Sequence, residues 1–391
     1  MIKSYAVTTT EVDDAEAAVR QMAERVASIA LLKNSMGIIT AHPEFVSSGI
    51  YGQVVKSLPF PTVGATSISH CVNGTIDSYM MSVFILTSDD CSFSCGVSGP
   101  VPKSGDVAEV TRECYGKLRG GLPEEPKLAL FYAPFFNNDP CCQSRYISAI
   151  SEMNERLPVF GTIANDDHVG TLALSNAQVL CGGEAYKDRF ALALISGNIS
   201  PKFYIDSVTE DAVIMANIGT ITATDGNKLL EINNVKAADF LKDAGFLSGV
   251  LDSSNKGLLS SVIILQLNSG AFISRIPTHV EGDSLFCGGQ LVNGAVLSVA
   301  FNTKESVIET AKRTMSAIKK ERGGGTALIH TCLGRRYGLL NEPMRELELI
   351  SEILDGGFSY VAAYSNGEFC PVGSGSVSNQ EHNQTLIVCV F

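Results

Sequence analysis

The chain ends in "EHNQTLIVCVF", and the first half of this segment is rich in side chains that could bind a ligand. Glu381, His382, Asn383, Gln384 and Thr385 can all donate or accept hydrogen bonds. The apolar run that follows lacks alternation and is rich in β-branched residues, so it predicts a strand covered on both faces. Two interpretations are open. The polar side chains finish a turn and satisfy nearby backbone groups, or they point into a pocket and hold something.

A thiol next to two arginines suggests a different chemistry. Cys332 follows the predicted strand "TALIH" and precedes Arg335 and Arg336, whose charge would lower the pKa of a thiol. If His382 and Glu368 fold beside it, Cys332 could act as a nucleophile. "TCLGRR" carries no motif of a known cysteine hydrolase, so a thiol-dependent enzyme stands as an alternative only.

Clusters of glycine and polar residues also follow other predicted strands, namely "VGATSIS", "GTIANDD" and "YSNGEF". Loops beyond the strands of an α/β sheet are where such folds place their ligands. Asp166 and Asp167 could bind a cation or an ammonium group, although capping of a helix or turn is their default role. Each cluster taken singly is equally explained by a turn that needs Gly, Ser, Asn and Asp.

Charge and composition argue against several classes of protein. The 391 residues carry a net charge of −12 and no run of Lys and Arg, which argues against a nucleic-acid partner. The chain begins without an apolar leader, and its apolar runs are far shorter than a bilayer requires, so we expect a cytoplasmic protein without membrane contact. Eleven scattered cysteines favour buried thiols, and no pair of CxxC motifs supports a structural zinc. These features do not identify a cofactor.

The first half of the chain predicts alternating strands and helices. Apolar residues recur at helical spacing from Val19 to Ile29 behind an acidic first turn, which predicts an amphipathic opening helix. Short β-rich runs then alternate with helical patterns near 107–119 and 143–156. This alternation indicates an α/β fold.

The middle of the chain, from about residue 177 to residue 235, has successive strands without a helix. It predicts an antiparallel β section, with a hairpin turn at Asp225-Gly226. Alternation then resumes with "VIILQL", "VLSVAF", a long helix and the final strand. The expected fold is therefore a two-lobe mixed α/β protein in which mixed β-sheets are flanked by helices, with the antiparallel section in the middle and a boundary near residue 200.

Taken together, the segments "VGATS", "PVFGTIANDD", "TCLGRR", "YSNGEF" and "HNQTLIV" resemble the FIST family in order and approximate spacing. This family is a two-part sensory domain of signal-transduction and F-box proteins. The resemblance covers essentially the whole chain and implies a FIST N-like lobe at 1–200 and a FIST C-like lobe at 201–391. With no F-box before the first part and no kinase, cyclase or chemoreceptor module after the second, it suggests a free-standing bacterial-type member.

Two departures bear on the ligand that the resemblance implies. Gly161-Thr162 stands where the family tends to have Gly-Gly, and Tyr364-Ser365-Asn366-Gly367 stands where Tyr-Gly is usual. We therefore expect that the ligand of this chain could differ from that of other members.

The resemblance implies a small-molecule sensor without catalytic activity, which reports to a separate signalling protein. An amino acid or a similar metabolite is the ligand usually proposed for the family. Arg335 or Arg336 could bind its carboxylate, and Glu368 could be the counter-ion of its ammonium. The alternative is that Glu368 pairs with an arginine only to hold two loops together. The expected ligand-binding residues are Cys332, Arg335, Arg336, Asn366, Gly367, Glu368, His382, Asn383, Gln384 and Asp166.

A haem-binding gas sensor is a further alternative, because some proteins of the same family bind haem. Haem would need an axial His, Cys or Tyr facing an apolar slot. His70 and His168 lie beside predicted strand ends, but the chain has no CxxCH motif and no single histidine stands out.

Overall fold

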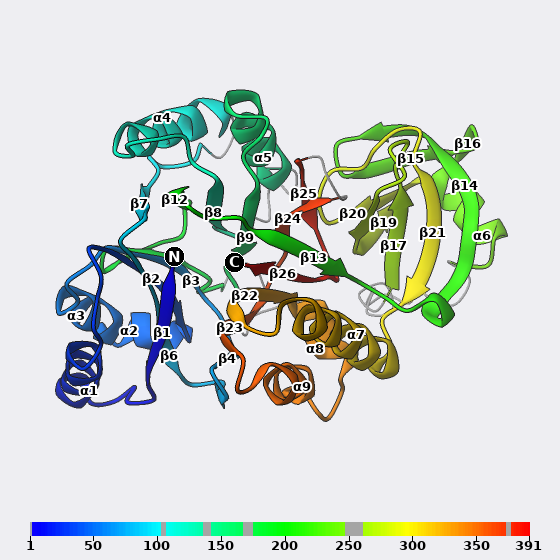
Figure 1. Ribbon diagram of the computed structural model, residues 1–391. Helices are drawn as coiled ribbons and strands as arrows, with labels where there is room; N and C mark the ends of the chain where they lie inside the picture. The colour runs from blue at the N-terminus through cyan, green and yellow to red at the C-terminus, as the bar shows by residue number, and fades with distance from the viewer. Residues whose placement is uncertain (1, 103–106, 136–141, 167–174, 247–260, 373–376) are drawn as a thin grey trace.

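The computed structural model describes residues 2–391, apart from 103–106, 136–141, 167–174, 247–260 and 373–376 (Figure 1). Its strands form three six-stranded sheets and one eight-stranded antiparallel sheet. Helices pack on the outer faces of the six-stranded sheets. The mixed α/β fold that the sequence predicts is confirmed. Among the described residues, no helix combines the length and the apolar character that crossing a bilayer requires.

The three six-stranded sheets share one pattern of strand pairing. Each contains a central parallel pair, two antiparallel strands on one side of it and a hairpin on the other. The first sheet has the order β1 (Lys3–Thr9), β6 (Met81–Ser88), β2 (Asn34–Ala41), β3 (Thr62–Thr66), β10 (Val179–Cys181), β11 (Glu184–Tyr186). The second has the order β7 (Cys91–Val97), β12 (Ala191–Gly197), β8 (Leu128–Ala133), β9 (Val159–Ile163), β24 (Glu368–Val372), β25 (Ser378–His382). The third has the order β13 (Lys202–Asp206), β26 (Leu386–Val390), β22 (Gly325–Cys332), β23 (Phe358–Ser365), β4 (His70–Val72), β5 (Thr75–Asp77).

The hairpin of each sheet is exchanged between these three units. β4 and β5 follow β3 in the chain, but β4 pairs with β23 of the third sheet. β10 and β11 follow β9, but β10 pairs with β3 of the first sheet. β24 and β25 follow β23, but β24 pairs with β9 of the second sheet. The exchange links the three sheets in a ring, so the two halves of the chain share two of the sheets.

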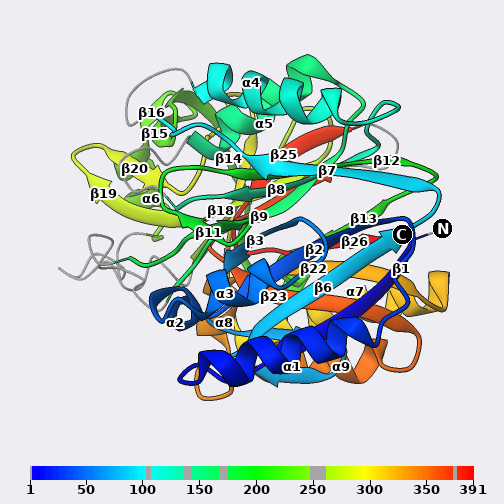
Figure 2. The same cartoon turned by 90° about the vertical axis from the view of Figure 1, so that its left-hand side faces the viewer.

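The sheets enclose one core and carry three others on their outer faces. Ile38 of β2 and Leu328 of β22 belong to a core between the three sheets. Ile39 and Ile329, the next residues along these strands, pack outward against helices because side chains alternate between the two faces of a strand. The outer helices are α1 (Ala15–Ala27), α2 (Pro43–Ser47) and α3 (Ile50–Lys56) on the first sheet, α4 (Val107–Gly120) and α5 (Cys142–Met153) on the second, and α7 (Lys304–Arg322), α8 (Leu333–Gly338) and α9 (Arg345–Leu354) on the third (Figure 2).

The eight-stranded sheet is an insertion between β13 and α7, on one side of the ring (Figure 1). The predicted antiparallel section exists, but it starts and ends later than expected: "VIILQL" and "VLSVAF" are antiparallel strands within it. Its hairpin turn at Asp225-Gly226 is confirmed, with Gly226 at a φ of 58°. The insertion contains β14 (Val213–Asp225), β15 (Lys228–Ile232), β16 (Val235–Lys236), α6 (Ala237–Asp243), β17 (Ser261–Gln266), β18 (Phe272–Arg275), β19 (Pro277–Glu281), β20 (Ser284–Cys287) and β21 (Val296–Phe301).

Two glycines allow close contact within the central parallel pairs. A Cβ atom at Gly64 of β3 would lie 1.8 Å from the carbonyl oxygen of Ile39, and one at Gly161 of β9 would lie 1.8 Å from that of Phe131. Any larger residue would push the paired strands apart. The glycines of "VGATS" and "FGTIA" therefore hold the strand ends that carry the polar clusters.

Candidate functional site

The polar clusters that follow β3, β9 and β23 meet at one place in the ring. The backbone N–H of Asn165 donates to Thr66 O at 3.1 Å, and its side-chain Oδ1 accepts from Ile68 N at 3.0 Å. Ser67 Oγ donates to Tyr364 O at 2.9 Å. The Nδ2 of Asn165 also donates to Tyr364 O, so Asn165, which the sequence did not single out, ties the strand ends of all three units together.

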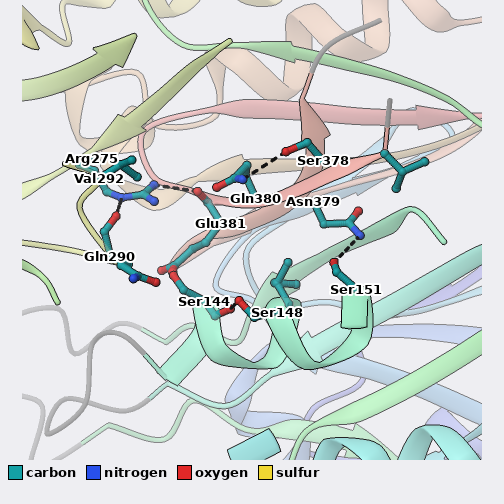
Figure 3. A pocket seen from close by; sticks show the side chains of 12 residues that line it. Ser144, Ser148, Ser151, Arg275, Gln290, Val292, Ser378, Asn379, Gln380 and Glu381 are labelled. Carbon is teal, nitrogen blue, oxygen red and sulfur yellow. Dashed lines mark hydrogen bonds between the residues drawn. The ribbon is translucent and has the colours of Figure 1, made fainter. Parts of the chain in front are cut away.

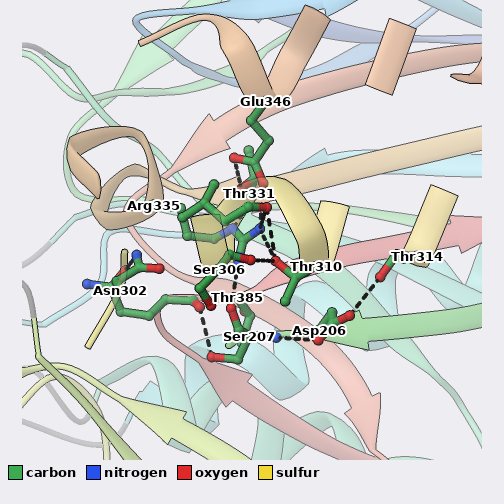
Figure 4. A network of polar contacts seen from close by, with 12 residues as sticks. Asp206, Ser207, Asn302, Ser306, Thr310, Thr314, Thr331, Arg335, Glu346 and Thr385 are labelled. Atoms are coloured by element: carbon green, nitrogen blue, oxygen red, sulfur yellow. Dashed lines mark hydrogen bonds and ion pairs between the residues drawn. The ribbon is translucent and has the colours of Figure 1, made fainter. Parts of the chain in front are cut away.

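Arg335 is a buried structural residue in the third unit (Figure 4). Its guanidinium forms an ion pair with Glu346 of α9 at 2.6 Å. It also donates to Ser207 O at 2.6 Å and to Thr310 Oγ1 at 2.9 Å. Arg335 thus joins α8 to α9, to α7 and to the segment after β13, and its ion pair is with Glu346 rather than Glu368.

Glu368 lies at the start of β24, directly opposite His382 of β25. It is fully buried, and its carboxyl oxygens accept from Ser365 Oγ at 2.5 Å and from Thr385 Oγ1 at 2.6 Å. Burial raises the pKa of Glu368 to about 8, because the hydrogen bonds offset only part of the lost hydration. At neutral pH the carboxyl group therefore retains its proton for most of the time, which weakens it as a counter-ion.

His382 and Cys332 are held in their neutral forms by burial. The Nε2 of His382 lies 3.2 Å from Cys370 O, to which it donates, and burial lowers the pKa of His382 to about 3. Burial raises the pKa of the Cys332 thiol, and nearby Glu368 raises it further. The Arg335 charge, which was expected to activate the thiol, lowers this pKa by less than burial raises it. A thiolate nucleophile is therefore disfavoured at this position.

The remaining residues of the expected site hold turns or strand ends. Asn366 Nδ2 donates to Ala164 O at 2.9 Å. Gln384 has a φ of 56°, and its Oε1 accepts from Asn302 Nδ2 at 2.8 Å. Asn383 Nδ2 donates to His382 O at 3.0 Å, while its Oδ1 is buried without a partner among the described residues.

Three further positions complete this set. A Cβ atom at Gly367 would lie 2.8 Å from Ile163 Cδ1, so the residue packs closely against β9. Asp166 is buried and accepts from Asn176 N. The Nε of Arg336 is buried without a partner among the described residues. Asp167 and His168 lie outside the described residues.

His70, the other histidine considered for haem, is fully buried. Burial, and to a smaller extent neighbouring His42, lower its pKa to about 3. Among the described residues, His, Cys, Asp and Glu form no group of three or more suited to a metal ion.

A pocket of about 430 Å³ opens between α5, β25 and the end of β18 (Figure 3). Polar residues form most of its wall, and two of them are a buried arginine and a buried glutamate, Arg275 and Glu381. The other lining residues are Ser144, Ile147, Ser148, Ser151, Gln290, Val292, Val377, Ser378, Asn379 and Gln380.

Arg275 and Glu381 are fixed by bonds to the surrounding backbone and side chains. The Nε of Arg275 donates to Gln290 O at 2.8 Å, and one of its terminal nitrogens donates to the backbone oxygen of Glu381 at 2.7 Å. The Glu381 carboxylate accepts from Ser144 Oγ at 2.6 Å. Its carboxyl group packs against Gly289, where a Cβ atom would lie 3.0 Å away.

Opposing effects act on the pKa of the Glu381 carboxyl group. Burial raises the pKa of its carboxyl group, whereas the Arg275 charge and the Ser144 hydrogen bond lower it. Burial is the larger effect, so the carboxylate would gain from a positive ligand group placed beside it. The sequence showed Glu381 as part of a polar run but gave no signal for Arg275, which lies far from it in the chain.

Two family models match this chain. The model described as the FIST N domain matches residues 35–235, and the one described as the FIST C domain matches residues 237–371. No curated protein matches. Among solved structures, a cyanuric acid hydrolase from A. caulinodans is similar over 100% of this chain and 99% of its own, with 10% identity and a TM-score of 0.33. A similarity of that size supports no conclusion about fold or function.

Proposed function

Because the chain belongs to the FIST family, whose domains are sensory domains that bind small ligands in signal transduction, we propose that it is a sensor of an amino acid or a closely related metabolite. In this proposal the ligand binds in the pocket lined by Arg275 and Glu381, and no reaction takes place. The protein acts in the cytoplasm and reports its ligand to a separate signalling protein.

One observation carries the proposal: Arg275 and Glu381, both buried, line the same pocket. A guanidinium suits a carboxylate, and a carboxylate suits an ammonium, so the two walls match the two charged groups of an amino acid. The volume of about 430 Å³ is in the usual range for small-ligand pockets, about 300–1,000 Å³. Hydroxyl and amide groups of Ser148, Ser151 and Gln290 add donors and acceptors for a polar side chain.

Glu368 and His382, which the sequence analysis expected in the site, lie next to Glu381 but do not line this pocket. His382 follows Glu381 directly, and Glu368 lies opposite His382 on the neighbouring strand. The hydrogen bonds of Glu368 with Ser365 and Thr385 fix the start of β24. We therefore propose that this cluster positions Glu381 rather than contacting the ligand.

The test is a thermal-shift screen of amino acids, amines and short carboxylates on the parent protein and on Glu381→Gln. The substitution keeps the shape and the acceptor for Ser144 but removes the charge that an ammonium needs. A ligand at a hundredfold excess over Kd should stabilise the parent by about 2.7 kcal/mol and the variant by clearly less. Glu368→Gln is the control for replacing a buried glutamate, because Glu368 does not line the pocket and mostly retains its proton at neutral pH, so that its replacement removes little charge.

A second variant blocks the pocket from its surface. Ser148 is exposed and lines the pocket, so Ser148→Phe should abolish the ligand shift while Ser148→Ala retains it. A ligand that stabilises the parent, Glu381→Gln and Ser148→Phe equally would refute the proposal. A screen in which no amino acid or amine stabilises the parent would refute it as well.

A further inference from the structure

A second, larger cavity of about 860 Å³ lies between the inserted antiparallel sheet and the third six-stranded sheet. Its walls include Ile205 and Thr385 from the third sheet and its flanks, Val372 and His382 from β24 and β25, and Ile264 and Phe272 from the insertion. A ligand in this cavity would therefore touch both the insertion and the ring.

This cavity and the Arg275–Glu381 pocket lie on opposite sides of one wall. Ser274 and His382 line the larger cavity, whereas the neighbouring residues Arg275 and Glu381 line the smaller pocket. Consecutive side chains of a strand point to opposite faces, so the ends of β18 and β25 separate the two spaces. The two cavities can therefore hold different ligands.

The charged groups of the larger cavity disfavour an anion. Asp206 and Glu210 line it, and the lining residues in the described part of the chain include no Lys or Arg. Asp206 already pairs with Arg313 at 2.7 Å and accepts from Thr314 Oγ1 at 3.1 Å. A neutral or cationic ligand fits this lining. An anion would meet the carboxylates of Asp206 and Glu210, and the guanidinium of Arg313 is already paired with Asp206.

The polar end of the cavity offers acceptors. Ser274 Oγ donates to Ser207 Oγ at 3.0 Å, and Ser207 Oγ donates to Gln384 O at 3.0 Å. Thr385 Oγ1 uses its hydrogen on Glu368. The Nε2 of His382 donates to Cys370 O, and its Nδ1 is buried behind this end without a partner among the described residues. A ligand group at this end must therefore supply the hydrogen.

The remaining lining mixes polar residues with apolar ones, and one apolar side chain is largely exposed. Phe272 is 57% exposed although it lines the cavity, and Ile205, Ile264 and Val372 provide further apolar surface. An aromatic side chain exposed at the rim of a cavity gains when an apolar molecule covers it.

We propose that this cavity is a second ligand site for a neutral or cationic amphipathic molecule, whose hydroxyl, amide or ammonium head donates to the hydroxyl oxygens of Ser207 and Ser274 and whose apolar body packs on Phe272 and Ile264. The site is separate from the amino-acid pocket and does not depend on it. Binding there bridges the insertion and the third sheet.

The experiment uses three probes that share one chain and differ only in the head group: hexanol, hexylamine and hexanoate. Their dissociation constants are measured with the purified full-length protein by ligand-observed NMR. Hexanol and hexylamine should bind at least about tenfold more tightly than hexanoate, because only they combine a donor head with the absence of negative charge. Hydrogen exchange should slow in β18 and in the segment 205–213 when hexylamine is bound.

Two tryptophan substitutions on β14 provide the matched variants. Ala216 is exposed and lines the cavity, whereas Ile214 is exposed on the same strand and does not line it. Ala216→Trp should weaken hexylamine binding at least about tenfold, while Ile214→Trp and Glu381→Gln should leave it unchanged. The proposal would be overturned if hexanoate bound as tightly as hexanol and hexylamine, or if no probe bound at all. It would also be overturned if the two tryptophan substitutions weakened binding equally, or if Glu381→Gln abolished it. Thermal shifts by amino acids that persist in Ala216→Trp would support the separation of this cavity from the Arg275–Glu381 pocket.

Discussion

Replacing Glu368 with glutamine should stabilise the protein at alkaline pH and not at acidic pH. Glu368 is fully buried, and its ordinary pKa of 4.5 is raised to about 8. Glutamine has the same shape as the protonated carboxyl group. Its amide can donate to Ser365 Oγ, and its oxygen can accept from Thr385 Oγ1, so the two side-chain contacts survive.

The direction and size of the effect follow from the pKa. Below pH 4.5 the folded and unfolded states both carry the proton, so Glu368 costs nothing. As the pH rises to about 8, the unfolded chain loses its proton while the folded protein keeps it, and stability falls. At about 1.4 kcal/mol per pH unit, the loss over this interval is up to about 5 kcal/mol. The glutamine variant avoids this loss because its side chain does not titrate.

The assay is urea unfolding of parent and Glu368→Gln at half-unit steps from pH 4.5 to pH 9. The free energy of unfolding of the variant, relative to the parent, should rise steadily to about pH 8 and then stay constant. Glu113→Gln, an exposed position on α4, controls for the change of residue type. A difference between Glu368→Gln and the parent that is flat across this range, or that falls with pH, would show that Glu368 is ionised in the folded protein.

Two other predictions concern the third unit. Glu346→Gln should cost about 3–5 kcal/mol in urea unfolding, because it leaves the buried Arg335 charge without its partner. Glu352→Gln on the same helix, which breaks the exposed pair with Arg345, should leave the midpoint almost unchanged, and similar losses at both positions would contradict the assignment of Arg335. Leu386→Asp should lower the free energy of unfolding by at least about 4 kcal/mol, because the side chain is fully buried in the core under α7 and α9. Leu386→Met should cost less than about 1.5 kcal/mol, and a melting temperature for Leu386→Asp close to that of the parent would contradict the burial of β26.

Local patterns predicted the single elements well. The apolar stripe of the first helix is confirmed, with Met22 and Val26 buried in α1. Val307 and Met315 are buried on one face of α7, and Val388 is buried in the last strand. Each of these signals lies within one continuous segment, where the helical or strand period decides which face is covered.

Pairing between distant strands could not be predicted in the same way. "VIILQL" is apolar enough to suit a parallel or an antiparallel neighbour, and only the fold decides that it pairs with "VLSVAF" and with the strand that ends at Arg275. The exchanged hairpins are harder still, because β4 follows β3 closely but pairs with β23, far along the chain. No local signal specifies such a partner, since hairpin residues satisfy their own turn wherever the hairpin docks.

The partner of Arg335 shows the same limit at the site. Glu346 lies in "MRELELISEIL", where it looks like an ordinary acid in the first turn of a helix. It becomes buried because α9 packs against the third sheet and α8 follows β22 directly. Glu368 was expected to pair with a ligand ammonium or with one of the two arginines, yet its described hydrogen-bond partners are hydroxyl and backbone groups.

The polar run before the last strand has both of the roles that the sequence left open. Gln384, with its positive φ, and Thr385, bonded to Glu368, belong to the turn that leads into β26. Glu381 and His382 lie on β25, where alternation sends one side chain into the smaller pocket and the other into the larger cavity. A shift of one residue in the pairing of β25 with β24 would exchange these two positions and place a carboxylate among the acceptors of the larger cavity. The pairing of Glu368 with His382 therefore fixes which side of the wall presents a charge and which presents a neutral ring.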